Sequence, residues 1–251
     1  MIIQIIGLPG SGKTTLAKVL ADKINATHLN ADEVRADLCK DLGFTPEDRI
    51  EQARRMGALA RLLESKGQIV VVDFVCPTKE TRDAFGKKNI LVWMDRIQEG
   101  RFEDTNAMWQ DPDDADIIFD IGFTPEEEAN EVIRFSQLHD WSKPTTLMLG
   151  RYQPWHEGHH ALYKEAGKRT DQVMLGVRST YGTSEKDPLT FDQVRGYIAE
   201  DSIMDHAMVI KMPNITNIVY GRDVGYKIEQ VKLDVAIEAI SATQKRKEMG
   251  I

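Results

Sequence analysis

The stretch GLPGSGKT, Gly7 to Thr14, decides how the first half of this sequence folds. It follows the apolar run IIQII and fits the pattern G-x-x-x-x-G-K-[ST], which joins a strand to a helix around bound phosphates. Glycines let the backbone N–H groups of such a loop turn inward, and the N-terminus of the following helix adds positive potential. The sequence therefore predicts a nucleotide-binding loop.

Individual roles follow from this pattern. The Lys13 ammonium would reach the β- and γ-phosphates and act in catalysis, and the Thr14 hydroxyl would bind Mg²⁺, the cofactor that the motif implies. Asp73 ends the apolar run QIVVVDF, where such folds place the carboxylate on the Mg²⁺ side; alternatively it caps the following turn. The residues predicted to contact the phosphates of ATP are Gly7, Gly10, Ser11, Gly12, Lys13, Thr14 and Thr15.

Strand and helix patterns alternate along the first part of the chain. The runs QIVVVDF, NILVWM and DIIFDI are typical of buried strands. Helices are expected over residues 13–24, after Asn30, over 46–65 and over 125–138, the third and fourth with N-cap threonines before proline. This alternation favours a parallel sheet, so we predict a P-loop NTPase α/β domain over residues 1–140.

The polar segment HDWSKPTT, residues 139–146, interrupts this pattern and marks the expected domain boundary. After it, TTLMLG, QVMLGV, MVIKM and NIVYG are expected as strands, with helices after residue 156, over 190–203 and over 241–250. We therefore expect a second, smaller Rossmann-like α/β domain over residues 145–251. Its ligand site should lie at the carboxyl ends of its strands.

Composition and charge narrow the possible functions. The chain has 251 residues, of which 41% are hydrophobic and 29% charged, and a net charge of −8, so nucleic acid is not expected as a partner. No apolar run approaches the roughly 18 residues of a spanning helix, and the first residues lack a cationic signal region, so no membrane partner is expected. Cys39 and Cys76 form neither a disulfide framework nor a zinc set, which favours a cytoplasmic location.

Charged residues after the first helix indicate an acceptor site. The segment LNADEVR, Leu29 to Arg35, lies where a second strand would bring side chains toward the γ-phosphate. Asp32 could orient or deprotonate an attacking hydroxyl, and Arg35 could bind a substrate anion. The alternatives are that Asp32 only occupies the first turn of a helix and that Arg35 is a solvated helix charge.

The first half resembles the adenylylsulfate kinases. That family has a segment close to L-D-G-D-N-V-R, matched here by LNADEVR, and its pattern G-F-S-x-E-D-R-x-x-N-x-R-R is matched over residues 43–55. Val75-Cys76-Pro77 corresponds to the family's I-S-P. The resemblance implies that Asp32 is the carboxylate facing the hydroxyl and that Arg35 and Arg49 lie near the acceptor's phosphate.

Some positions depart from the family. Asn30, Ala31 and Glu33 replace three residues of D-G-D-N, and Gln52 replaces the asparagine. The family's lid segment R-D-x-K-G-L-Y has no counterpart in DRIQEGRFEDTNAMWQDPDDAD, residues 95–116. Phe102 or Trp109 could replace the lid aromatic that stacks on the acceptor adenine, or could pack the lid. We therefore expect a small-molecule alcohol as substrate, smaller than adenylylsulfate or different in shape.

The second half has its own phosphate-binding signature. GRYQPWHEGHH, Gly150 to His160, places an H-x-G-H motif at the start of a helix, and ISATQKR, Ile240 to Arg246, fits I-S-x-T-x-x-R. Together these motifs resemble the nucleotidylyltransferase superfamily, and most closely the nicotinamide mononucleotide adenylyltransferases, with G-R-F-Q-P-x-H-x-G-H. The likeness covers most of residues 145–251.

Nucleotidylyl transfer needs neutralised charge and aligned reactants. His156 and His159 would donate hydrogen bonds to the α- and β-phosphates, and Arg246 would pair with phosphate, which makes these three the predicted catalytic residues. Ser241 could also serve only as an N-cap, and a zinc site at the histidines lacks a further ligand. The other predicted phosphate-binding residues are Gly150, Arg151, Ser241 and Thr243, and the substrate-binding candidates are Arg35, Arg49, Arg222 and Asp223.

The two signatures predict a bifunctional enzyme. ATP would phosphorylate a small-molecule hydroxyl, and a second NTP, ATP or CTP, would then transfer its nucleotidyl group to the phosphomonoester with release of pyrophosphate. The alternatives are an activated-sulfate enzyme, a nicotinamide riboside kinase joined to its adenylyltransferase, and a nucleotidylyltransferase with a nucleotide-sensing P-loop domain. The sequence leaves open the acceptor, the base of the second NTP, the pathway and the oligomeric state, with a homo-oligomer as one option.

Overall fold

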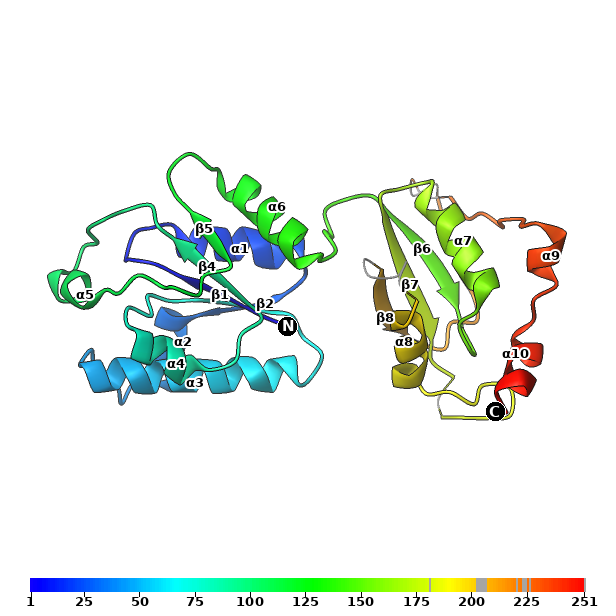
Figure 1. Cartoon of the computed structure of the whole chain (residues 1–251), viewed down its shortest axis with the longest axis horizontal. Coiled ribbons are helices and arrows are strands. Elements are labelled where there is room, and N and C mark those ends of the chain that lie inside the picture. The colour runs from blue at the N-terminus through cyan, green and yellow to red at the C-terminus, as the bar shows by residue number, and fades with distance from the viewer. Residues whose placement is uncertain (181, 202–206, 220, 223–224, 226, 251) are drawn as a thin grey trace. The chain divides into compact units, whose positions relative to one another are not determined.

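The computed structural model describes residues 1–180, 182–201, 207–219, 221–222, 225 and 227–250. The chain divides into two compact units, Met1–Trp141 and Ser142–Ile251 (Figure 1). The first part of the predicted boundary segment belongs to the first unit, because Asp140 is buried and the Trp141 N–H donates to the Lys23 carbonyl. Within the described ranges, no helix combines the length and the apolar character that crossing a membrane requires.

In the described residues, the first unit contains a five-stranded sheet with the order β2-β3-β1-β4-β5, and all of its strand pairs are parallel. The strands are β1 Ile2–Ile6, β2 Thr27–Asn30, β3 Val70–Asp73, β4 Ile90–Met94 and β5 Ile117–Phe119. The helices are α1 Lys13–Lys23, α2 Ala31–Leu38, α3 Pro46–Glu64, α4 Lys79–Phe85, α5 Glu103–Met108 and α6 Pro125–Ser136. The predicted parallel α/β fold of this half is confirmed.

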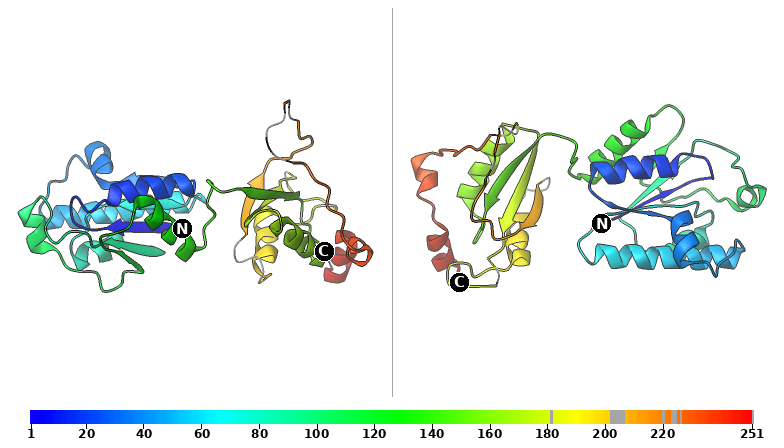
Figure 2. Two further views of the ribbon diagram at one scale, coloured as in Figure 1. Left: turned by 90° about the horizontal axis from the view of Figure 1, so that it is seen from above. Right: turned by 180° about the vertical axis from the view of Figure 1, so that it is seen from behind.

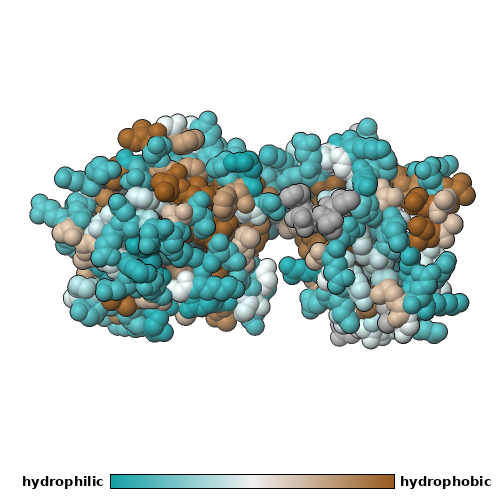
Figure 3. All heavy atoms as spheres, viewed as in Figure 1, coloured by the Kyte–Doolittle hydropathy of each residue, from teal (hydrophilic) through white to brown (hydrophobic). Residues whose placement is uncertain are grey.

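Apolar side chains pack on both faces of this sheet because each residue along a strand points to the face opposite its neighbour's. Ile3 and Ile5 of β1 pack in one core cluster with α1 and α6, whereas Ile2 and Ile6 pack in the other with α3 and α4. Figure 1 shows α1 and α6 on one side of the sheet and α2, α3 and α4 on the other. The outer faces of both units visible in Figure 3 are mostly hydrophilic.

The loop between β1 and α1 requires glycine for two separate reasons. Gly7 has a φ of 152°, and a Cβ there would lie 2.7 Å from the Met94 carbonyl oxygen of β4. Gly12 has a φ of 94° and forms the left-handed N-cap of α1. The chain therefore turns tightly at the carboxyl end of the central strand, which leaves the first turn of α1 facing the end of the sheet.

The second unit has a smaller parallel sheet in its described part, with the order β6-β7-β8. Leu175, Val194 and Ile198 are buried at the centre of its core. Helix α7 packs on β6 and β7, as the views in Figure 2 show. The elements are β6 Thr145–Gly150, β7 Gln172–Arg178, β8 Met208–Met212, α7 Glu157–Gly167, α8 Phe191–Ala199, α9 Val235–Glu238 and α10 Ala242–Met249.

Two expectations for this unit are wrong. The described residues 217–219 of the predicted strand NIVYG form no strand, and Ile218 and Val219 are 53% and 87% exposed. An apolar run becomes a strand only where a sheet edge receives it, and these side chains pack against no core. The helix predicted to reach residue 203 ends at Ala199, and residues 202–206 lie outside the described part.

The crossing of α3 over α4 gives a test of this packing. A Cβ at Gly57 of α3 would lie 2.0 Å from the Phe85 carbonyl oxygen, so Gly57→Ala should lower the free energy of unfolding by about 2 kcal/mol or more. Gly196→Ala in α8 meets no atom within 4 Å and should instead raise it by about 0.5–1 kcal/mol, because alanine favours helix. Denaturant titrations followed by circular dichroism would measure both, and a neutral or stabilising Gly57→Ala would contradict the packing described.

Candidate active site

A cavity of about 420 Å³ lies in the first unit where β1, β2 and β3 end. The nucleotide-binding loop forms one wall, and residues after β2, after β3 and from the segment between β4 and α6 form the others. Parallel sheets place their ligand sites at this edge. The lining includes Gly10, Lys13, Thr14, Asn30, Asp32, Arg35, Phe44, Arg49, Gln52, Asp73, Arg101 and Phe102.

Lys13 is held against its own loop. Its side chain is buried, and Nζ donates to the Leu8 carbonyl oxygen at 2.9 Å. Burial lowers the pKa of Lys13 to about 8, although the negative charges of Asp73 and Asp32 oppose the change. A buried ammonium with a single carbonyl partner retains unused donors, so an anion that enters the cavity can take the place of Leu8.

Asp73 is the centre of a hydrogen-bond cluster that joins β2, β3 and α1. Its Oδ2 accepts from the Thr14 hydroxyl at 2.5 Å, and its Oδ1 lies 2.6 Å from His28 Nε2. Asn30 Nδ2 donates to both carboxylate oxygens, at 3.1 and 3.2 Å. Burial raises the pKa of Asp73, but the hydrogen bonds from His28, Thr14 and Asn30 outweigh it and hold the pKa below its usual range.

Asn30 also starts the helix that presents Asp32. Its Oδ1 accepts from the backbone N–H groups of Asp32 and Glu33, at 3.0 and 3.1 Å, which caps α2. Asp32 thus lies in the first turn of a helix, and its exposed side chain also lines the cavity. The two roles considered for Asp32 are therefore compatible.

Two arginines flank one aromatic ring in the cavity. The guanidinium carbons of Arg35 and Arg49 lie 4.8 and 5.8 Å from the centroid of the Phe44 ring. Burial, followed by the positive charge of Arg49, lowers the pKa of Arg35. Arg49 also pairs with Asp104 at 2.8 Å, so it links this wall to α5.

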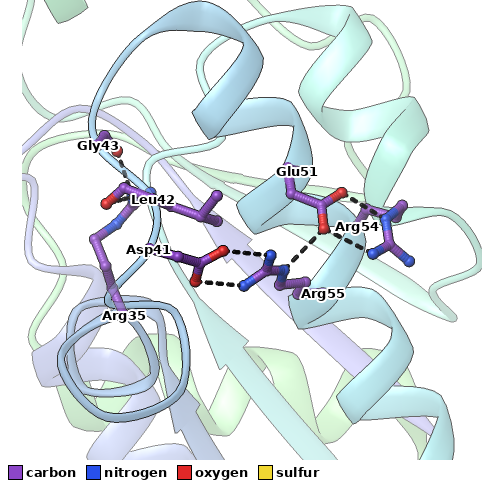
Figure 4. Close-up of polar contacts among 7 residues, drawn as sticks. All are labelled: Arg35, Asp41, Leu42, Gly43, Glu51, Arg54 and Arg55. Carbon is purple, nitrogen blue, oxygen red and sulfur yellow. Dashed lines mark hydrogen bonds and ion pairs between the residues drawn. The ribbon is translucent and has the colours of Figure 1, made fainter.

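The loop that carries Phe44 is fastened at several points (Figure 4). Arg35 donates to the carbonyl oxygens of Leu42 and Gly43, at 3.4 and 2.5 Å. On the outside of α3, Arg55 holds Asp41 through two bonds of 2.8 and 2.7 Å and also contacts Glu51. Arg55, part of the pattern that suggested the acceptor site, therefore serves the loop and not the cavity.

The segment between β4 and α6 contributes one aromatic residue to the cavity. Phe102 lines the cavity and is 55% exposed, whereas Trp109 packs against Trp93 with ring centroids 6.5 Å apart. Arg101 lines the same wall. Of the two aromatic candidates, Phe102 is therefore the one whose ring lines the cavity.

In the second unit, His156 and His159 lie together at the start of α7. Their rings are stacked with centroids 3.8 Å apart, and His156 Nδ1 accepts from the Gly158 N–H at 3.1 Å. The Trp155 ring also stacks on the His159 ring, with centroids 5.4 Å apart. Burial, with a smaller contribution from His156, lowers the pKa of His159 to about 3, and its buried Nδ1 has no partner. His159 is therefore a neutral imidazole.

The second motif of this unit lies against the first. Arg246 Nη1 donates to the Gln153 carbonyl oxygen at 2.8 Å, and Lys245 pairs with Glu157 at 3.1 Å. Residues some 90 positions apart in the sequence thus meet at the start of α7. Ser241 caps α10 by accepting from the Gln244 N–H at 3.1 Å. Thr243 accepts from Arg246 Nη2 at 3.1 Å.

The remaining predicted residues of this unit are less closely grouped. Arg151 pairs with Asp187 at 3.1 Å, and Gly150 ends β6 beside the histidine loop. Arg222 is exposed, and Asp223 lies outside the described residues. His160, given no role by the sequence, bonds Asp201 at 2.8 Å. Groups of three or more potential metal ligands among His, Cys, Asp and Glu are absent from the described part of the chain.

Sequence reasoning missed His28 and Arg101. His28 stands in THLN, a short polar strand without an apolar pattern, although its spacing of two residues from Asn30 places both on one face of β2. Arg101 lies in the segment where the expected lid motif was absent, so no pattern pointed to it.

Comparison with known proteins links the first unit to one family. The family model "Adenylylsulphate kinase" matches residues 1–95. An adenylyl-sulfate kinase of Bacillus licheniformis is 30% identical over 164 residues, which cover 53% of this chain and 83% of that protein. One of Shewanella baltica is 43% identical over 89 residues, or 34% of this chain and 43% of that protein, so less than half of the latter is spanned. A solved structure of Mycobacterium tuberculosis APS kinase in complex with AMPPNP and APS aligns with 26% identity and a TM-score of 0.49, covering 53% of this chain and 95% of that one.

The buried histidine of α7 predicts a specific titration. A histidine with a folded pKa near 3 and an ordinary value of 6.5 binds more protons when unfolded, so it lowers stability as the pH falls through this window and contributes nothing above it. Ring-proton NMR of the full chain should show one imidazole signal that stays constant from about pH 8 to about pH 4.5. That signal should be the one lost in His159→Gln. A midpoint between about pH 6 and 7 for this signal would show that His159 is solvated.

Proposed function

This chain belongs to the adenylyl-sulfate kinase family through its first unit, and on that premise we propose that residues 1–141 transfer a phosphoryl group from ATP to a hydroxyl of a small molecule. The observation that carries the proposal is the shared cavity, which brings Lys13 and Thr14 of the phosphate loop together with Asp32, Arg35 and Asp73. Phosphoryl transfer needs these groups: cations for phosphate, oxygen ligands for a metal and a carboxylate for the attacking hydroxyl.

The residues present fit Mg²⁺. The Thr14 hydroxyl and the Asp73 carboxylate provide hard oxygen ligands, and a pKa below the usual range keeps Asp73 ionised. Bound with ATP, the ion would neutralise phosphate charge. Thr14 and Asp73 are accordingly the residues that we propose to hold it, directly or through water.

The protein residues then have separate tasks. Lys13 exchanges the Leu8 carbonyl for a phosphate oxygen, while the backbone N–H groups of Gly10, Ser11 and Gly12 surround the phosphates. The acceptor oxygen forms a bond to the γ-phosphorus as the bond to the β–γ bridging oxygen breaks and ADP leaves. The hydroxyl proton passes to the Asp32 carboxylate. Arg35 and Arg49 hold the acceptor's anionic group beside the Phe44 ring.

Adenylylsulfate is the first acceptor to test, because the named relatives are adenylyl-sulfate kinases. The exposed face of Phe102 and the two arginines suit a planar, anionic alcohol. Asn30, Ala31 and Gln52 differ from the family pattern, so a panel of other small alcohols belongs in the same assay. A nucleotide sensor in place of a kinase would bind ATP without transferring phosphate to any of them.

Asp32→Asn provides the test of the kinase. It keeps the size of the side chain but removes the proton acceptor, so kcat should fall by about 100-fold or more while ATP binding is retained. Transfer of the γ-phosphate to adenylylsulfate and to the alcohol panel would be followed by ³¹P NMR. Glu33→Gln, the neighbouring change on α2, is the control and should keep nearly full activity. Equal activity of Asp32→Asn and the wild type, or no transfer by the wild type to any alcohol, contradicts the proposal.

A second activity has its own supporting observation. The contacts of Arg246 with Gln153 and of Lys245 with Glu157 bring the I-S-x-T-x-x-R and H-x-G-H motifs to one place. We therefore also propose that residues 142–251 form a Rossmann-like nucleotidylyltransferase, for which phosphate-binding groups must converge from both motifs. The proposed domain corresponds to the predicted 145–251.

In this reaction a phosphomonoester oxygen attacks the α-phosphorus of ATP or CTP, and the bond to the α–β bridging oxygen breaks to release pyrophosphate. His159, neutral at physiological pH, donates a hydrogen bond as charge develops on the phosphates, together with His156. Arg246 pairs with the departing phosphates. The other residues to which we assign phosphate or substrate binding are Gly150, Arg151, Ser241, Thr243, Arg222 and Asp223.

The two proposed activities form a sequence, because a kinase makes the phosphomonoester that the transferase uses. Such an enzyme would convert an alcohol, ATP and a second NTP into a nucleotide-linked product. A nicotinamide riboside kinase joined to its adenylyltransferase is one such case. An activated-sulfate enzyme, which would pair a sulfurylase with the kinase, is the other named alternative.

Pyrophosphate release gives the test of the second unit. With ATP or CTP and a panel of phosphomonoesters that includes nicotinamide mononucleotide, His159→Ala and Arg246→Ala should each lower the rate by about 100-fold, because each removes a donor to the developing charge. Lys13→Met should leave this step intact and abolish only phosphorylation of the alcohol. Lys168→Gln, an exposed change at the far end of α7, is the control. The absence of pyrophosphate release by the wild type with every pair would reject this second activity and leave the kinase untouched.

A further inference from the structure

His28 contacts Asp73 in the proposed nucleotide site of the first unit, although no motif includes this histidine. Its Nε2 lies 2.6 Å from Asp73 Oδ1, and its side chain is 17% exposed while that of Asp73 is 1% exposed. Because an ionised carboxylate can only accept hydrogen bonds, Nε2 must carry the proton of this contact. The tautomer of His28 is thereby fixed as a donor to Asp73.

The sheet explains how this contact arises. Strand β2 runs parallel to β3 with Asn30 beside Asp73 and His28 beside Val71. His28 and Asn30 are two residues apart, so their side chains share one face of the strand and both reach the same carboxylate. A short polar strand at the edge of the sheet thus provides two donors to one buried group.

These donors leave little freedom to the carboxylate. Oδ1 accepts from His28 and from Asn30 at 3.2 Å, while Oδ2 faces the Thr14 hydroxyl at 2.5 Å. Rotation about the Cβ–Cγ bond would break the contact with His28, the shorter of the two bonds to Oδ1. His28 therefore helps to fix the plane of the Asp73 carboxylate, in which one oxygen faces His28 and the other faces Thr14 at the start of α1.

We propose that His28 is a positioning residue that holds Asp73 Oδ1, so that Oδ2 and the Thr14 hydroxyl together receive the divalent cation bound with a nucleotide. The inference rests on the proposed nucleotide site of the first unit, but not on the identity of the acceptor. Residues that orient metal-binding carboxylates typically change metal affinity by about 10- to 100-fold when they are removed. Their removal should change the affinity for a nucleotide without the metal much less.

The experiment measures ADP binding to the full chain by calorimetry, once with Mg²⁺ and once with EDTA. His28→Leu should weaken binding with Mg²⁺ about 10-fold and change binding in EDTA by less than about twofold. His28→Gln, whose amide can donate to Oδ1, should recover most of the loss. Thr27→Val is the matched control, because Thr27 precedes His28 on β2 and its hydroxyl bonds Gln68 at 2.7 Å, away from Asp73.

Each other outcome overturns the inference. Equal weakening with and without Mg²⁺, or the same loss in Thr27→Val, would show that His28 only supports the strand. Unchanged binding in His28→Leu would show that Asp73 needs no such support, and a wild-type chain that binds no ADP would remove the site itself. The proposed kinase is judged separately by phosphate transfer to alcohols, so either idea can fail while the other stands.

Discussion

The site of the first unit depends on the hydrogen bonds that surround the buried carboxylate of Asp73. It joins three elements that are far apart in the sequence, because Thr14 belongs to α1, His28 and Asn30 to β2, and Asp73 itself to β3. A buried anion is costly unless donors surround it, and here each donor also fixes the element that carries it. The same Asn30 side chain caps α2, so the position of Asp32 follows from the same cluster.

The sites proposed for phosphate in the two units differ in where their positive charge lies. In the first, a buried cation and the N-terminal turn of α1 face the cavity, and the cation is held by a carbonyl until an anion arrives. In the second, the buried group is an uncharged imidazole stacked between His156 and Trp155, and the positive charge comes from Arg246 on a separate helix. A neutral donor would suit the nucleotidylyl transfer proposed for this unit, in which charge moves from one phosphate to the next.

Features that depend on only a few consecutive residues could be predicted from the sequence. The loop 7–14 and the N-cap at Thr45 depend on backbone geometry over a few residues, and both were located correctly. His28 could not be found this way, because its contact with Asp73 depends on the register between β2 and β3, which the sequence does not state. The strand predicted for the run NIVYG is wrong because its apolar side chains suit a strand, but the described residues 217–219 meet no sheet edge.

The lowered pKa of Lys13 has a consequence for the resting protein. With a value near 8, this side chain exchanges protons in mildly alkaline solution, where an ordinary lysine would still be fully charged. An entering phosphate favours the ammonium form, so phosphate binding at this loop would take up a proton from the solvent near and above pH 8. As the pH rises through about 8, Lys13 therefore progressively loses the positive charge that would attract a phosphate anion to this loop.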